Sequence, residues 1–182
     1  PNNQLGAQKD NLDQILKGAN IIAYLDPSIL SDYVPDFGIL AAPFLLKSPG
    51  DLDKIAKSDW FKEMQKTARD KGLEVLAIDW YYGTRHTIGN RAIKGPEDFK
   101  GMKIRTPTGI MWIETFKALG ASPTVVQLSE LATALEQKIV DGCEGTLIQS
   151  YQFKFHELVK EVSLTGHFMG VGGLIMSPKI FD

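Results

Sequence analysis

The chain has 182 residues, which suits one large domain or two small lobes. Hydrophobic residues make up 43% and charged residues 23%, proportions that support a sizeable core. A net charge of -2 with interspersed acids and bases argues against a general nucleic-acid surface. No apolar stretch approaches the roughly 18–20 residues of a membrane span, and the single cysteine, Cys143, excludes an internal disulfide.

Apolar runs alternate with helical patterns, which predicts an α/β protein. In the first half we expect helices over 8–17 and 48–71, strands over 21–25, 73–78 and 85–88, and proline-broken loops over 27–49. The longer helix is predicted because Ser48 suits an N-cap, Pro49 suits the first turn and Gly72 ends the pattern.

The second half repeats the alternation. We expect a turn over 96–101, strands over 102–106 and 124–128, helices over 109–119, 129–138 and 151–158, a loop and strand over 140–147, and extended chain from Glu161. The helix-then-strand order around Lys17 recurs around Lys138, which fits two similar α/β lobes. Ligands of such folds usually bind where the strand order switches.

Arg105 is the first candidate for ligand binding. It follows apolar Ile104 on a short strand that Pro107 ends, so the two side chains face opposite sides of the sheet. Its guanidinium group matches a carboxylate with two parallel hydrogen bonds, and the carboxyl end of a strand is where ligands usually bind. The alternative is a surface arginine paired with Glu97 or Asp98.

Aromatic residues form a second candidate feature. Trp80, Tyr81 and Tyr82 precede Arg85, and aromatic walls with a convergent charge are typical of small-ligand pockets. Packing in the core or at its rim explains Trp80 and Tyr82 equally well. For Trp112, which lies four residues before Phe116 on a predicted helix, core packing is the favoured interpretation.

No catalytic, metal or cofactor site emerges from the spacing. Cys143 and the histidines His156 and His167 lack a spacing that would join a thiol to a base, and a lone cysteine is usually a buried apolar residue. The histidines also lack metal-ligand spacing. The glycines over 166–173 precede an apolar run instead of a helix, so a phosphate-binding loop is not indicated.

The chain carries a series of short motifs in this order: Pro1-Asn2-Asn3-Gln4-Leu5-Gly6, Gly83-Thr84-Arg85-His86, Lys94 to Gly101, Met102 to Pro107, Phe116 to Thr124, Ser129-Glu130-Leu131, Ala134-Leu135, Val140-Asp141-Gly142 and Phe153 to Glu157. Together they resemble the substrate-binding proteins of TRAP (tripartite ATP-independent periplasmic) transporters, the DctP-like receptors. The resemblance implies an α/β, two-lobed periplasmic-binding-protein-like fold, with a ligand cleft between lobes that crossing strands join.

The resemblance also implies site residues. The arginine that forms a salt bridge with the ligand carboxylate falls on Arg105, and a second arginine falls on Arg85. A polar contact falls on Asp26, and Leu128 stands where relatives often carry phenylalanine. Cys143-Glu144-Gly145 replaces Gln-Glu-Asn, so Glu144 and Gly145 join the ligand-binding candidates. With the phenyl ring and the asparagine both lost, we expect room for a bulkier or aromatic acid, with Trp80, Tyr82 and Trp112 lining the pocket.

The implied domains are an incomplete first lobe over 1–82, a second lobe over 83–170 and a return strand over 171–182. Relatives have further elements before and after this region, so we expect a truncated chain. The implied function is that of a periplasmic, non-enzymatic receptor, monomeric and without cofactor, which passes a small organic carboxylate to the membrane components of a TRAP transporter. Alternatives are an α/β enzyme that acts on a carboxylic acid through Asp79, Glu144 or His86, and a ligand-sensing input domain.

Overall fold

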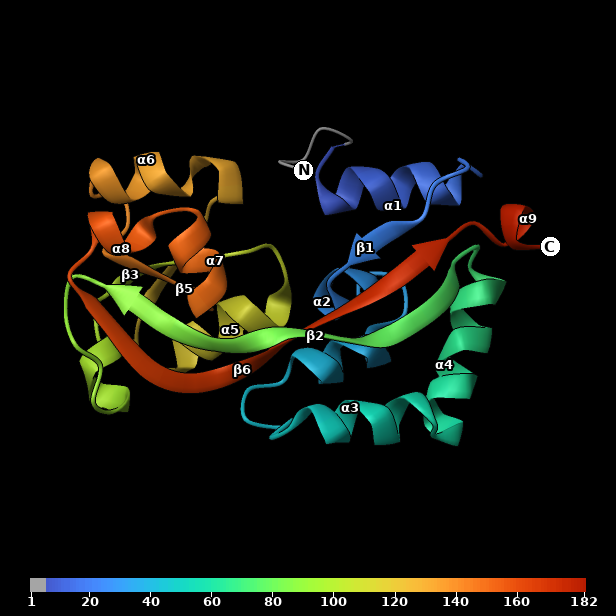
Figure 1. Ribbon diagram of the computed structural model, residues 1–182, viewed down its shortest axis with the longest axis horizontal. Coiled ribbons are helices and arrows are strands. Elements are labelled where there is room, and N and C mark those ends of the chain that lie inside the picture. Colours follow the sequence, from blue (N-terminus) through green and yellow to red (C-terminus); the bar gives the residue numbers. More distant parts are fainter. Residues whose placement is uncertain (1–5) are drawn as a thin grey trace. The chain divides into compact units, whose positions relative to one another are not determined.

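The computed structural model describes residues 6–182, so most of the motif Pro1 to Gly6 lies outside the described residues (Figure 1). The chain folds into two compact units, one made of the described residues up to Tyr82 with Val171–Asp182, the other of Gly83–Gly170. Strands β2 (Glu74–Gly89) and β6 (Glu161–Met176) each continue from one unit into the other. The hydrogen-bonded strand order is β1-β6-β2-β5-β3-β4.

The first unit surrounds a short sheet. Its other elements are β1 (Ala23–Leu25), α1 (Gln8–Leu16), α2 (Pro27–Leu30), η1 (Pro35–Ala41), α3 (Pro49–Ala56), α4 (Asp59–Asp70) and α9 (Pro178–Phe181). β1 pairs antiparallel with β6, with Tyr24 opposite Leu174. Helix α1 lies on one side of these strands and α3 and α4 on the other (Figure 1). The core of the unit includes Leu12, Phe37 and Ile175, all fully buried.

The second unit has helices on both faces of its sheet. Its other elements are η2 (Pro96–Phe99), β3 (Lys103–Thr106), α5 (Ile110–Ala118), β4 (Ser122–Val125), η3 (Leu128–Glu130), α6 (Leu131–Glu136), β5 (Gly142–Thr146), α7 (Leu147–Gln152) and α8 (Phe155–Leu158). β3 runs parallel to both β4 and β5, whereas β5 runs antiparallel to β2. Helix α5 lies on one side of the strands and α6, α7 and α8 on the other (Figure 1).

These two sides define two cores. Ile104 packs with Trp112 and Phe116 of α5 in one of them. Cys143 packs with residues of α6 and α8, such as Leu135, in the other. Because side chains alternate along a strand, Arg105 projects from the face opposite to Ile104.

The α/β class is as predicted, but some predicted elements are wrong. The single helix expected over 48–71 is two helices, α3 and α4, because the Ser58 hydroxyl donates to the Ile55 carbonyl at 2.6 Å and accepts from the Phe61 amide at 3.2 Å. That hydroxyl therefore serves the end of one helix and the start of the next.

Other predicted elements differ in their bounds. The strands expected over 73–78 and 85–88 are one continuous strand, β2. The strand expected over 124–128 is β4 (Ser122–Val125), followed by η3. The helix expected over 151–158 is divided into α7 and α8 because Lys154 adopts the left-handed conformation, with φ of 57°. The loops expected over 27–49 contain α2 and η1, each with a proline in its first turn.

Candidate anion-binding site

Arg105 lies near the carboxyl end of β3, between two parallel neighbours. It is level with Thr124 on β4 and Cys143 on β5. Its side chain is only 5% exposed, and its Nε donates to the carbonyl of Val126, just beyond the end of β4, at 2.8 Å. This bond holds the guanidinium near the carboxyl ends of the parallel strands, where ligands of open α/β sheets usually bind.

The charge of Arg105 is not balanced by a direct partner. Within residues 6–182 Arg105 forms no ion pair with a carboxylate. Burial lowers the pKa of Arg105, Glu144 opposes this effect, and Arg85 adds to it. An arginine nevertheless keeps its proton in a folded protein. A buried cation without a counter-ion costs free energy, so this position favours an anion that would pair with it.

Arg85, the second predicted ligand contact, is already paired. Its Nε lies 2.5 Å and its Nη2 2.6 Å from the two carboxylate oxygens of Glu144, and both residues are buried. The Arg85 guanidinium also lies over the ring of Trp112, 4.8 Å from its centroid. Burial raises the pKa of Glu144, but the charge and hydrogen bonds of Arg85, together with the nearby His167 and Arg105, outweigh this effect and keep that pKa below its ordinary value. Arg85 and Glu144 thus form a buried, two-bond ion pair.

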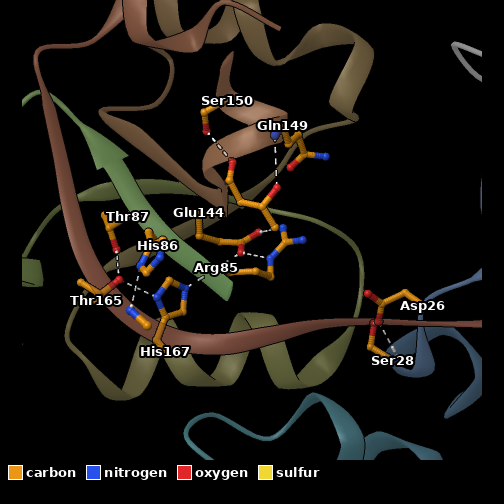
Figure 2. A network of polar contacts seen from close by, with 12 residues as sticks. Asp26, Ser28, Arg85, His86, Thr87, Glu144, Gln149, Ser150, Thr165 and His167 are labelled. Carbon is orange, nitrogen blue, oxygen red and sulfur yellow. Dashed lines mark hydrogen bonds and ion pairs between the residues drawn. The ribbon is translucent and has the colours of Figure 1, made fainter. Parts of the chain in front are cut away.

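This ion pair continues into a chain of polar groups on β2, β5 and β6 (Figure 2). His167 Nε2 lies 4.0 Å from Glu144 Oε2, and His167 Nδ1 lies 2.7 Å from the Thr165 hydroxyl. That hydroxyl is 3.2 Å from the hydroxyl of Thr87. His167 Nε2 is buried without a hydrogen-bond partner within the described chain. A proton on Nε2 would point toward the carboxylate, so the neutral Nε2–H form fits this site.

We expect His167 to make folding stability depend on pH. Burial lowers the pKa of His167 from 6.5 to about 4, although the Glu144 charge opposes this. The unfolded chain therefore takes up a proton below pH 6.5 that the folded chain resists, so stability is full above 6.5 and falls toward pH 4. The fall amounts to about 3 kcal/mol.

Chemical denaturation of the full-length protein at pH values from 7 to 4 would measure this effect. His167→Asn should flatten the slope over this range relative to the unchanged protein. The control is His156→Asn, at an exposed histidine, which should leave the slope as it was. Parallel pH profiles for the unchanged protein and His167→Asn would contradict the assignment.

The remaining predicted residues of the second unit lie in different surroundings. Leu128 begins η3 and packs, half-buried, against the core that contains Cys143. Trp112 is 2% exposed and lies in the core with Phe168, 4.1 Å between ring centroids, in agreement with its favoured interpretation. Gly145 lies on β5 opposite His86. The room expected beside Gly145 holds the Gln149 side-chain oxygen, 3.0 Å from where a Cβ would stand.

The predicted residues of the first unit are Asp26, Trp80 and Tyr82. Asp26 is buried, and its Oδ1 accepts from the backbone nitrogen of Ser28 at 2.9 Å and from the Ser28 hydroxyl at 2.6 Å, which caps α2. Trp80 is 53% exposed, and Tyr82 is half-buried. The ring of Tyr24 meets both edge-on, at centroid distances of 5.9 and 6.0 Å.

The thiol of Cys143 lacks the surroundings of a nucleophile. Burial raises its pKa to about 12, with Glu144 adding to the effect. A thiol with such a pKa carries almost no thiolate at neutral pH. Across residues 6–182 no group of three or more His, Cys, Asp or Glu side chains is placed to hold a metal ion, and no helix has the length and apolar character of a membrane span.

Two polar residues of the second unit were not predicted from the sequence. His167 was considered only as a metal ligand or a base. Its position near Glu144 depends on the pairing of strands, such as the antiparallel register of β2 and β5, which the sequence does not reveal. Gln149 was not considered. A signal for it was available, since a glutamine in the first turn after a strand that ends in Gly145-Thr146 lies near any ligand at that strand end.

A buried arginine held at the carboxyl ends of parallel strands, in a chain of two α/β units, suits the binding of an anionic solute. The chain belongs to the bacterial extracellular solute-binding protein family 7 (DctP), which matches residues 1–182. This assignment confirms the resemblance inferred from the motifs. The family consists of solute-binding proteins, a class distinct from the α/β enzyme considered as an alternative.

Individual relatives agree with the family assignment. The sialic acid-binding periplasmic protein SiaP of Vibrio cholerae is 33% identical over 100% of this chain and 57% of its own length. A TRAP periplasmic solute-binding protein from Desulfovibrio salexigens, in complex with diglycerolphosphate, is 40% identical with a TM-score of 0.93, over 98% of this chain and 58% of its own.

A third relative is a TRAP periplasmic solute-binding protein from Ochrobacterium anthropi with bound L-fuconate, 38% identical with a TM-score of 0.91, over 98% of this chain and 60% of its own. The chain therefore spans more than half, but less than two thirds, of each of these relatives.

Proposed function

We propose that the protein containing this chain binds a small organic acid and delivers it, chemically unchanged, to the membrane components of a TRAP transporter. Arg105 pairs with the carboxylate of that acid. The single observation that carries the proposal is the buried guanidinium of Arg105, which forms no ion pair within the described chain and lies at the carboxyl ends of three parallel strands. A carboxylate would neutralise it through two parallel hydrogen bonds.

In this proposal Arg85 has a supporting role. Because Glu144 occupies its Nε and Nη2, Arg85 brings little net charge to a ligand, and the Arg85–Glu144 pair adds rigidity beneath the site. Asp26, Trp80 and Tyr82 stay candidate contacts. Closure of the two lobes around the ligand and a monomeric state likewise stay predictions.

The relatives support an acidic ligand and a location outside the cytoplasm. SiaP is named for sialic acid and for the periplasm, and the Ochrobacterium anthropi structure holds L-fuconate. The Desulfovibrio salexigens structure holds a phosphate compound, so an anion is the chemistry that these ligands share. We infer a periplasmic receptor for this chain as well.

Mass spectrometry separates this receptor from the enzyme alternative. The full-length protein, purified under native conditions, should retain or take up one acid per chain when it is offered a panel of sugar acids, dicarboxylates and aromatic acids. The bound acid should be recovered with unchanged mass after long incubation. Conversion of any acid into a product would contradict the proposal, and so would the absence of binding to all acids of the panel.

A further inference from the structure

Gln149 carries an unengaged polar group beside the proposed site. Its backbone nitrogen donates to the Thr146 hydroxyl at 3.2 Å, which fixes the first turn of α7. Its side-chain amide makes no hydrogen bond to any of the described residues 6–182, and Figure 2 shows Gln149 on α7, near Glu144 and Arg85. The residue is half-buried, so part of its side chain lies against the protein while the amide stays available to a ligand.

Gly145 opens the space that this amide enters. A Cβ at Gly145 would lie 3.0 Å from the Gln149 Oε1, a separation tighter than most Cβ contacts, so the amide would have to move by a few tenths of an ångström. A side chain longer than that of alanine at this position would displace the amide further. The glycine and the glutamine therefore act together: the first lacks a side chain where the second places its polar end.

The strand register places this amide on the same side of the sheet as Arg105. Arg105 is level with Cys143 on the adjacent parallel strand, and Gly145 comes two residues further along β5. Since side chains two residues apart share a face, Gly145 and Arg105 face the same side, with about 8 Å between their Cα atoms. Both lie toward the carboxyl ends of their strands, as does the Val126 carbonyl that orients Arg105. A small acid held by Arg105 would reach the Gln149 amide.

We propose that Gln149 is a specificity-determining residue that selects hydroxylated acids, such as aldonates, over acids with a bare hydrocarbon chain. The proposal rests on the carboxylate-binding role of Arg105. An amide offers two donors and an acceptor, and a hydroxyl group both donates and accepts, so neighbouring hydroxyls on the ligand satisfy it. A bare alkyl or aromatic chain would bury the amide without a partner, which costs about 1–3 kcal/mol. This preference is the opposite of the aromatic acid expected from the sequence.

Calorimetric titration of the full-length protein with matched acids tests the proposal. The probes are D-erythronate with butanoate and D-galactonate with hexanoate, pairs that differ only in their hydroxyl groups. We expect at least one aldonate to bind about tenfold or more tightly than its unhydroxylated partner. Gln149→Leu, which keeps the size and removes the amide, should reduce that ratio by about tenfold.

Two further variants complete the test. Gly145→Ala should displace the amide and also reduce the ratio, which covers the case in which Gln149→Leu fails to fold. Gln152→Leu makes the same chemical change at an exposed site on α7 and should leave the ratio intact. Equal binding of hydroxylated and bare acids, or an unchanged ratio in both Gln149→Leu and Gly145→Ala, would overturn the role of Gln149. Failure of the Arg105 proposal is distinct, because Arg105→Ala would then bind both members of a pair as the unchanged protein does.

Discussion

Replacing Glu144 by glutamine should lower the free energy of unfolding by about 3–5 kcal/mol at pH 7, because Arg85 then stays buried without a counter-charge. The pair has two short contacts, and both residues are buried, so water cannot take over the role of the carboxylate. Urea denaturation of the full-length protein would measure the change. We expect loss of cooperative folding near physiological temperature if the full-length protein is marginally stable.

The matched control is Glu157→Gln. Glu157 forms an exposed ion pair with Lys154 at 3.7 Å, and such pairs contribute about 0–1 kcal/mol. The double variant Arg85→Met with Glu144→Leu removes both charges and should recover much of the lost stability, because apolar replacements of a buried pair are often neutral. A loss below about 1 kcal/mol for Glu144→Gln would show that the pair is not buried as described.

The pH dependence of this pair has a definite sign. The pKa of Glu144 lies below its ordinary value of 4.5, so the pair contributes fully above that value. The contribution is lost as the pH falls through the lowered pKa of the folded protein. His167 loses its contribution at higher pH, between 6.5 and about 4, so the two groups act in successive ranges.

Replacing Arg105 by alanine should weaken acid binding at least tenfold, and removal of one partner from a buried charge pair typically costs about 2–5 kcal/mol. Arg105→Lys should weaken binding as well, because an ammonium group cannot reproduce the two parallel hydrogen bonds of a guanidinium.

The stability of the ligand-free protein should not depend on Arg105 in the same way. Arg105 lacks an ion-pair partner among residues 6–182, so replacing it by methionine should not reduce the melting temperature and is expected to raise it.

The control for Arg105 is Arg91→Ala. Arg91 is exposed in the same unit, and its Nη2 donates to the Lys100 carbonyl at 2.9 Å. It should change neither affinity nor melting temperature by much. An Arg105→Met variant that melts at a lower temperature while it retains full affinity would show that Arg105 is a structural residue instead of a ligand contact.

Arg105 shows what could be predicted from the sequence. Its position after Ile104 and before Pro107 indicated a strand and the opposed directions of the two side chains, and the structure has both. The parallel neighbours, the Val126 contact and the missing ion pair were out of reach, since they depend on segments more than fifteen residues away. The alternative, a surface arginine in an ion pair with Glu97 or Asp98, is not what the structure has.

Arg85 shows more clearly what could not be predicted from the sequence. The resemblance implied a ligand contact at Arg85, which the sequence places after an aromatic run, and Glu144 was a separate candidate. Their mutual ion pair follows from the antiparallel register of β2 and β5, which places Thr146 opposite Arg85 and Glu144 opposite Thr87. Tertiary pairing decided the partner of each charge. In the same way, Ser58 divided a helix whose overall apolar pattern is continuous.

A crystal structure of the full-length protein with its bound acid tests the central claim most directly. The measured quantity is the distance from the carboxylate oxygens of the acid to the guanidinium nitrogens of Arg105. We predict two parallel contacts of about 2.7–2.9 Å, with the Nε still bound to the Val126 carbonyl. An acid bound elsewhere, with no ligand oxygen in hydrogen-bond range of Arg105, would contradict the account.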